Sequence, residues 1–244
     1  MIPVVVEKRD PERALVTVHI RQPGVPDRRA GGVYEDELRA HSNLISRRLD
    51  EDIAAGFIKA DDKNKDVFLK GIAHGPAAMI CEEIDILYRR KKHDKNGDFE
   101  LKINAHQLPL THGVALWTAV LAMEIYDPPQ HDHMERQLCW NIGHSKISPS
   151  DMLVIARGAY QYREIYKVWG VLVHQVAYDV LYDKYTIQEG NALRAAATGA
   201  RDMPELLDDM SARYVHLRDV KEHREQKAAR KAARNQRYDY PNLR

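Results

Sequence analysis

From Tyr34 to Val220, apolar residues recur at intervals of three and four positions along the chain. This spacing brings side chains onto one face of an α-helix, where they can pack against a core. The first such stripe runs through a charged segment and consists of Leu38, Leu44, Ile45, Leu49 and Ile53. The repeated pattern predicts a mainly α-helical fold.

Prolines delimit the helices predicted in the first half of the chain. Pro76 suits the first turn of a helix over about residues 77–91. A strongly apolar helix is expected over residues 110–126, and Pro128-Pro129 is expected to end it, because proline cannot continue the backbone hydrogen bonds of a helix. A short helix around residues 134–142 follows.

The clearest helix start is Ser148-Pro149-Ser150-Asp151. The serine can cap the helix, proline suits its first position, and an acidic residue stands three positions after the cap. A helical pattern continues to about residue 185, with Gly158 and Gly170 as candidate breaks. Its apolar positions cover more than one stripe, so we expect several neighbouring helices or a partner subunit to bury it.

The start of the chain differs from the rest. The β-branched runs Val4–Val6 and Leu15–Ile20 flank the turn signal Asp10-Pro11, which favours a small hairpin, with an extended arm as the alternative. Two prolines and three glycines in residues 22–32 predict a linker. The expected organisation is an arm and linker over residues 1–32, a helical domain over residues 33–217 and a basic helical tail over residues 218–244.

Composition narrows the class of protein. Hydrophobic residues make up 44% of the 244 residues, enough for a sizeable core, and the net charge of +1 creates no global field that attracts nucleic acid or membranes. Cys81 and Cys139 are too few for a disulfide scaffold and fit a reducing compartment, cytoplasmic or organellar. The longest uncharged apolar stretch, about Thr111 to Met123, is shorter than the ~20 residues of a membrane span.

Asp94-Lys-Asn-Gly-Asp98 follows a helix with a basic end. It resembles the opening of an EF-hand calcium loop, which places oxygen ligands at its first, third and fifth positions. The resemblance covers residues 94–105 and implies Asp94, Asn96 and Asp98 as calcium ligands, within an EF-hand-like unit over residues 77–126. The sequence departs from the family at the sixth and twelfth positions, where Phe99 replaces glycine and Ala105 replaces glutamate.

Two alternatives to a calcium site remain at this loop. One is an EF-hand fold that has lost its calcium, and the other is an Asn-Gly turn with acidic neighbours. Residues 61–66 are also acidic, but they fit the calcium pattern less well and are predicted to form a polar loop.

Histidine and cysteine side chains gather after Pro128-Pro129. Imidazole and thiolate groups are the ligands that zinc prefers in proteins, so they form a candidate zinc site. The alternative is a chance cluster in an exposed loop, since the chain has 12 histidines. The candidate ligands are His131, His133, Cys139 and His144.

The last helix is predicted to begin near Pro204 and to lose its apolar stripe after Val220. Positive residues without an acidic neighbour follow, and they can bind phosphates or an acidic protein surface, or can be solvated. These residues are Lys227, Arg230, Lys231, Arg234 and Arg237. Near the C-terminus, large side chains that are expected to dock on a partner are Tyr238, Tyr240 and Leu243.

The sequence has no phosphate-binding Gly-x-x-x-x-Gly-Lys loop, no dinucleotide fingerprint and no Gly-x-Ser-x-Gly elbow. Arms with docking residues are typical of subunits that become ordered on a partner. We therefore expect a non-catalytic structural or accessory subunit that needs no cofactor, binds other protein subunits and belongs to a multiprotein assembly. An organellar energy-transducing complex of the mitochondrion, with peripheral contact to a membrane complex, is one setting. The alternatives are a nucleic-acid-associated protein that uses the basic tail and a divalent-metal-binding protein.

Overall fold

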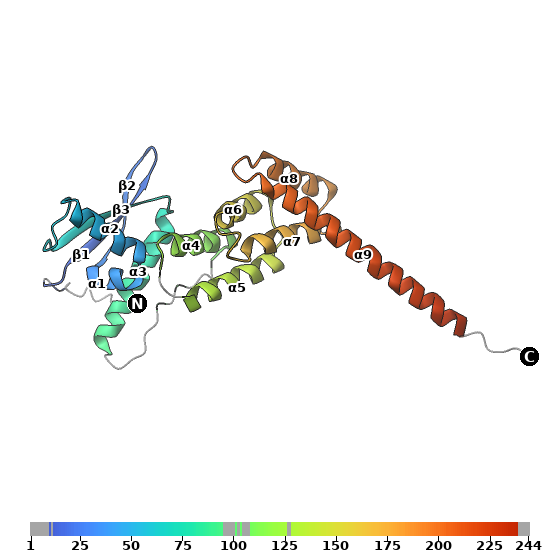
Figure 1. Cartoon of the computed structure of the whole chain (residues 1–244), viewed down its shortest axis with the longest axis horizontal. Coiled ribbons are helices and arrows are strands. Elements are labelled where there is room, and N and C mark those ends of the chain that lie inside the picture. Colours follow the sequence, from blue (N-terminus) through green and yellow to red (C-terminus); the bar gives the residue numbers. More distant parts are fainter. Residues whose placement is uncertain are drawn as a thin grey trace, which may run out of the picture. The chain divides into compact units, whose positions relative to one another are not determined.

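The computed structural model describes residue 10 and residues 12–94, 101, 103, 108–125 and 128–238, with side chains at 128–129 and 234–238 left aside. These residues are mainly helical, as the sequence predicts, with a small three-stranded sheet near the N-terminus (Figure 1). The chain divides into two compact units, residues 1–138 and 139–244, each with its own set of helices.

The sheet of the first unit has the order β2-β1-β3. Strand β1 (Leu15–Gln22) pairs antiparallel with β2 (Val25–Tyr34) and parallel with β3 (Asn64–Lys70). On β1, Val16, Val18 and Ile20 alternate with half-buried residues and form part of the core. The period of two places these side chains on the face of the sheet that the helices cover.

The prediction of a linker over residues 22–32 is wrong, because most of this segment is strand β2. Pro23 and Gly24 form the two-residue turn of the β1–β2 hairpin, and Gly24 has the positive φ of +74° that favours glycine. Pro26 is tolerated because β2 lies at the edge of the sheet. The hairpin partner predicted at Val4–Val6 lies outside the described residues.

The polar loop predicted over residues 61–66 is also partly wrong, because strand β3 begins at Asn64. Its exposed and buried residues alternate strictly, and Val67 and Leu69 face the core. The third inward position is occupied by Lys65. Because Lys65 is charged, the sequence does not show the alternation of polar and apolar residues that is typical of a strand.

The stripe from Leu38 to Ile53 forms two helices, α1 (Glu35–His41) and α2 (Asn43–Ala54). The break lies at Ser42, which is almost fully buried. Its hydroxyl donates a hydrogen bond to the carbonyl oxygen of Met123 at 2.6 Å and accepts one from the backbone N–H of Ile45. A tertiary contact with residues distant in sequence therefore places this helix boundary.

Helix α3 (His74–His93) packs against β2, where Gly31 allows a close approach. A Cβ atom added at Gly31 would lie 2.7 Å from the Cβ atom of buried Cys81, which is closer than two carbon atoms can approach. Helix α4 (Leu110–Ala122) forms where the sequence predicts it, but it ends four residues before the predicted end at residue 126, so the proline pair does not end it. Helix α5 (Pro128–His144) begins at that pair and is longer than the predicted short helix, because proline is well suited to a first helical turn.

The second unit contains the end of α5 and four further helices. Helix α6 (Pro149–Tyr160) begins as predicted, and the side chain of Ser148 accepts a hydrogen bond from the N–H of Asp151 at 3.1 Å. The helical pattern then breaks over residues 161–167, where hydrogen-bonded turns lead into α7 (Val168–Leu181). Neither Gly158 nor Gly170 forms this break, since both lie within helices.

Helix α8 (Ile187–Gly199) is not anticipated by the sequence analysis. It begins with a capping box, in which Thr186 and Glu189 each accept a hydrogen bond from the other's backbone N–H. Helix α9 (Glu205–Tyr238) begins next to Pro204, as predicted, and its first turns pack against α7 and α8 (Figure 1).

Candidate partner-binding helix

The first half of α9 is anchored on the second unit. Half-buried or buried residues recur along it at intervals of three and four, through Leu206, Met210, Tyr214 and Leu217. The indole N–H of Trp169 on α7 donates a hydrogen bond to Asp209 Oδ2 at 2.8 Å. This apolar stripe and the polar contact fix the direction in which the rest of the helix leaves the unit.

The second half of α9 has no such stripe. Every residue from 222 to 233 is exposed, and the helix nevertheless continues to Tyr238 (Figure 1). A helix of this length without packing contacts is only marginally stable in water, because nucleation costs conformational entropy. We call residues 222–238 the free end of α9.

The charges of the free end are sorted around the helix axis. With about 100° between successive residues, its four described basic side chains fall within an arc of about 120°. The opposite side carries small side chains at Ala228, Ala229, Ala232 and Ala233. The basic side consists of Arg224, Lys227, Arg230 and Lys231.

No acidic side chain of the described residues makes an ion pair with these four basic groups. Pairing does occur earlier on α9, where Arg218 contacts Asp219 at 3.1 Å and Glu222 at 3.8 Å. Residues 218–222 therefore form an exposed stretch whose charges pair with one another, whereas the four basic groups that follow make no ion pair with a described residue.

The other residues of the predicted tail site are only partly described. The backbone of Arg234, Arg237 and Tyr238 belongs to α9, and Tyr240 and Leu243 lie outside the described residues. In the sequence, Arg234 and Arg237 continue the three- and four-residue spacing of the basic side.

The candidate zinc ligands lie on α5, with His131 and His133 in the first unit and Cys139 and His144 in the second. His131 and His133 are two positions apart, which places them on nearly opposite sides of the helix. His133 Nε2 lies 2.8 Å from the amide nitrogen of Gln137, and Nδ1–H of His144 donates to the carbonyl oxygen of Trp140 at 2.7 Å. Over the described ranges, no three His, Cys, Asp or Glu side chains are grouped so that they could hold a metal ion. A zinc site that includes Cys139 stays a prediction.

The candidate calcium loop follows α3. Asp94 is exposed, and its backbone N–H donates to the carbonyl oxygen of Arg90 at 3.0 Å at the end of that helix. The other two candidate ligands, Asn96 and Asp98, lie outside the described residues. The calcium site therefore also stays a prediction.

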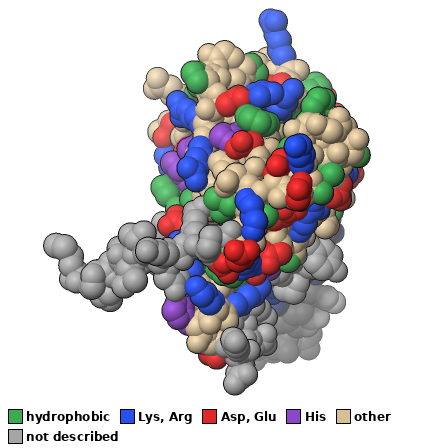
Figure 2. Space-filling model, turned by 90° about the vertical axis from the view of Figure 1, so that its left-hand side faces the viewer, with side chains coloured by type: hydrophobic (Ala, Val, Ile, Leu, Met, Phe, Trp, Pro, Cys, Tyr) green, Lys and Arg blue, Asp and Glu red, His purple; other side chains and the backbone are tan. Residues whose placement is uncertain are grey.

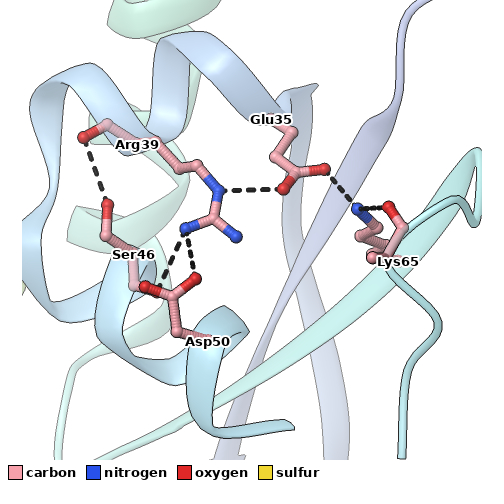
Figure 3. A network of polar contacts seen from close by, with 6 residues as sticks. Glu35, Arg39, Ser46, Asp50 and Lys65 are labelled. Atoms are coloured by element: carbon pink, nitrogen blue, oxygen red, sulfur yellow. Dashed lines mark hydrogen bonds and ion pairs between the residues drawn. The ribbon is translucent and has the colours of Figure 1, made fainter. Parts of the chain in front are cut away.

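A charge network in the first unit, which the sequence does not predict, extends from buried Lys65 to exposed Asp50 (Figure 3). Lys65 on β3 donates to Glu35 Oε2 at 2.6 Å and to the carbonyl oxygen of Ala60 at 2.8 Å. Glu35 also accepts from Arg39 Nε at 2.8 Å, and Arg39 pairs with Asp50 at 2.8 Å. Because each buried group has partners, the network serves to hold α1, α2 and the segment before β3 together.

The pKa of Glu35 reflects this network. Burial raises the pKa of its carboxyl group, and the hydrogen bonds from Lys65 and Arg39 more than offset that effect, so the pKa lies below its ordinary value. At Cys81, burial raises the pKa of the thiol to about 12, so the reactive thiolate form is suppressed at neutral pH.

One other face of the molecule carries charges of both signs. On the face drawn in Figure 2, Lys and Arg side chains lie interspersed with Asp and Glu side chains. A surface of that kind attracts neither polyanions nor polycations strongly. The one-sided basic arc of α9 therefore stands apart from the mixed charge on that face.

Comparison with family models, with curated proteins and with solved structures finds no match to this chain. Among the described helices, none is both long enough and apolar enough to cross a membrane.

Proposed function

We propose that this chain is a non-catalytic structural or accessory subunit of a larger multiprotein assembly, which it joins through the free end of α9. The observation that carries the proposal is a helix that continues through twelve consecutive exposed residues, 222–233. Contact with a partner would supply the packing energy that an isolated helix lacks.

The two sides of the free end are suited to different contacts. The alanine side lets another backbone approach closely, since its side chains are small. The basic side fits an acidic surface, because its four charged groups make no ion pair with a described residue. No large apolar side chain lies between residues 222 and 233, which argues against insertion into a lipid surface.

The setting of the assembly is part of the same proposal. Two cysteines and no sequence sign of a disulfide framework favour a reducing compartment, cytoplasmic or organellar. An organellar energy-transducing complex, as in the mitochondrion, is one setting for the assembly.

Sedimentation of the endogenous protein from a gentle native lysate tests the proposal. We expect the protein to sediment in a large particle that survives nuclease treatment. Sedimentation at the mass of a single chain would contradict the proposal.

Nucleic-acid binding is the second candidate, and the basic arc of α9 favours it. From residue 226 to residue 238 the sequence has five positive residues and no acidic one. A helix with this distribution can lie along phosphate groups. In this case the particle would collapse on nuclease treatment, and binding of the full chain to RNA would weaken steeply as the salt concentration rises.

A further inference from the structure

We propose that the free edge of strand β3 accepts an extended, basic segment of a partner protein as a fourth strand of the sheet. This surface lies in the first unit and is independent of α9. It combines an open strand edge, a groove beside that edge and an excess of carboxylates.

The backbone pairing shows which groups of β3 are open. The N–H of Leu15 donates to the carbonyl oxygen of Lys63 at 2.8 Å, so residues 63, 65, 67 and 69 direct their backbone groups toward β1. The backbone groups of Asn64, Asp66 and Phe68 must then point away from β1. Among the described residues β3 is an edge strand, so these groups can pair with an added strand.

A groove runs beside this edge. It has a volume of about 410 Å³ and lies between β3 and the segment from the end of α2 to residue 62. Phe57 lines it with 82% of its surface exposed, and Phe68 lines it with 41% exposed. Phe57 offers an apolar contact to an added strand, whereas the Phe68 ring already stacks on His19 and lies 4.7 Å from the guanidinium of Arg21.

The charge of the groove selects the partner. Asp52, Asp62 and Asp66 all line it. The only basic residue in the lining is Lys65, and its ammonium group is already bound to Glu35 and Ala60. A negative groove attracts Lys or Arg side chains and repels nucleic acid.

The carboxylates do not form a metal site. Asp66 Oδ1 lies 2.8 Å from His19 Nε2, and Asp62 Oδ2 accepts the backbone N–H of Lys59 at 2.9 Å. The groove lies wholly within the described part of the chain, where no three such ligands are grouped to hold a metal ion. An extended segment in which Lys or Arg alternates with apolar residues fits the open strand edge, the groove and the carboxylates. A strand presents every second side chain to the same face, so its basic side chains can all face the carboxylates.

Amide hydrogen exchange on the full chain tests this inference, with a seven-residue peptide of alternating Val and Lys as the probe. We expect the peptide to slow exchange at the outward N–H groups of Asn64, Asp66 and Phe68. A peptide of alternating Val and Glu serves as the matched control and should have no effect. Unchanged exchange at these three amides with the Lys peptide, or equal slowing by the Glu peptide, would overturn the inference.

A pair of variants tests the charge selection separately. Asp52→Asn removes a carboxylate that lines the groove, and Asp61→Asn removes an exposed one from the same segment that does not. We expect Asp52→Asn to weaken binding of the Val-Lys peptide by about two- to fivefold and Asp61→Asn to leave it unchanged. Equal affinities of the two variants would overturn the charge argument.

Discussion

The Nζ atom of Lys65 lies 2.6 Å from Oε2 of Glu35, in a pair that joins strand β3 to helix α1 (Figure 3). The Lys65 side chain is 2% exposed, and its amine also donates to the carbonyl oxygen of Ala60. One buried side chain therefore fixes the segment that precedes β3, which is also a wall of the groove beside that strand.

Replacement of Glu35 by Gln should destabilise the first unit strongly. The change leaves the Lys65 ammonium group buried without its counter-charge, and the expected loss of unfolding free energy is about 3–5 kcal/mol. Denaturant unfolding measures this loss. The exposed pair of Arg48 and Glu51 supplies the control, since Glu51→Gln should cost less than about 1 kcal/mol. Equal losses for the two variants would contradict the structural role of Glu35.

The stabilisation by Glu35 should depend on pH. Burial raises its pKa, but the hydrogen bonds from Lys65 and Arg39 lower the pKa by more, so the pKa in the folded protein lies below the ordinary value of 4.5. The contribution is therefore fully present above pH 4.5 and is lost as the pH falls through the pKa of the folded state. The difference in unfolding free energy between the wild type and Glu35→Gln should be largest near neutral pH and should shrink in acid. A constant difference from pH 7 to pH 3 would show that the carboxylate charge is not responsible.

Replacement of Gly31 by Ala should destabilise the contact between β2 and α3. The added Cβ atom would lie 2.7 Å from the Cβ atom of Cys81, and the expected cost is about 1–3 kcal/mol. Cys81→Ala should not restore stability, because alanine keeps the Cβ atom. Gly75→Ala on α3 is the control, since no heavy atom lies within 4 Å of its added Cβ atom. Thermal unfolding distinguishes the variants, and equal melting temperatures would refute the predicted clash.

Replacement of Asp209 by Ala should loosen the anchored half of α9. The indole N–H of Trp169, which is 6% exposed overall, would lose its acceptor, and the expected cost is about 1–3 kcal/mol. Asp219→Ala, which removes an exposed carboxylate from the same helix, should cost less than about 1 kcal/mol. Denaturant unfolding compares the two, and a larger loss for Asp219→Ala would contradict the assignment of Asp209 as the anchor.

The sequence predicts the elements of this fold whose pattern is purely local. Pro76 and the Ser148-Pro149 start predict α3 and α6, because proline suits a first helical turn and serine a cap. Runs of apolar residues predict α4 and the start of α9. Strand β3 is missed because Lys65 occupies an inward position and is tolerated only through a partner distant in sequence. The boundary at Ser42 likewise depends on the carbonyl group of Met123, which no local pattern reveals.

Parts of the candidate site could also be predicted. The spacing of Lys227, Arg230 and Lys231 in the sequence already places them on one side of a helix, and the structure adds that this stretch of helix is exposed. The groove beside β3 could not be predicted, because the sequence predicts a polar loop over residues 61–66, and the groove exists only because β3 forms there. The capping box of Thr186 and Glu189 is a local sequence signal for the start of α8.

Sedimentation of variant chains in native lysates tests the central claim most directly. One variant carries Lys227→Glu, Arg230→Glu and Lys231→Glu on the free end of α9. The control carries Arg28→Glu, Lys59→Glu and Lys70→Glu, which makes the same change in net charge at exposed positions of the first unit. We expect the wild type and the control to sediment in a large nuclease-resistant particle, and the α9 variant to sediment near the mass of a single chain. If the α9 variant sediments with the wild type, the free end of α9 does not hold this protein in an assembly.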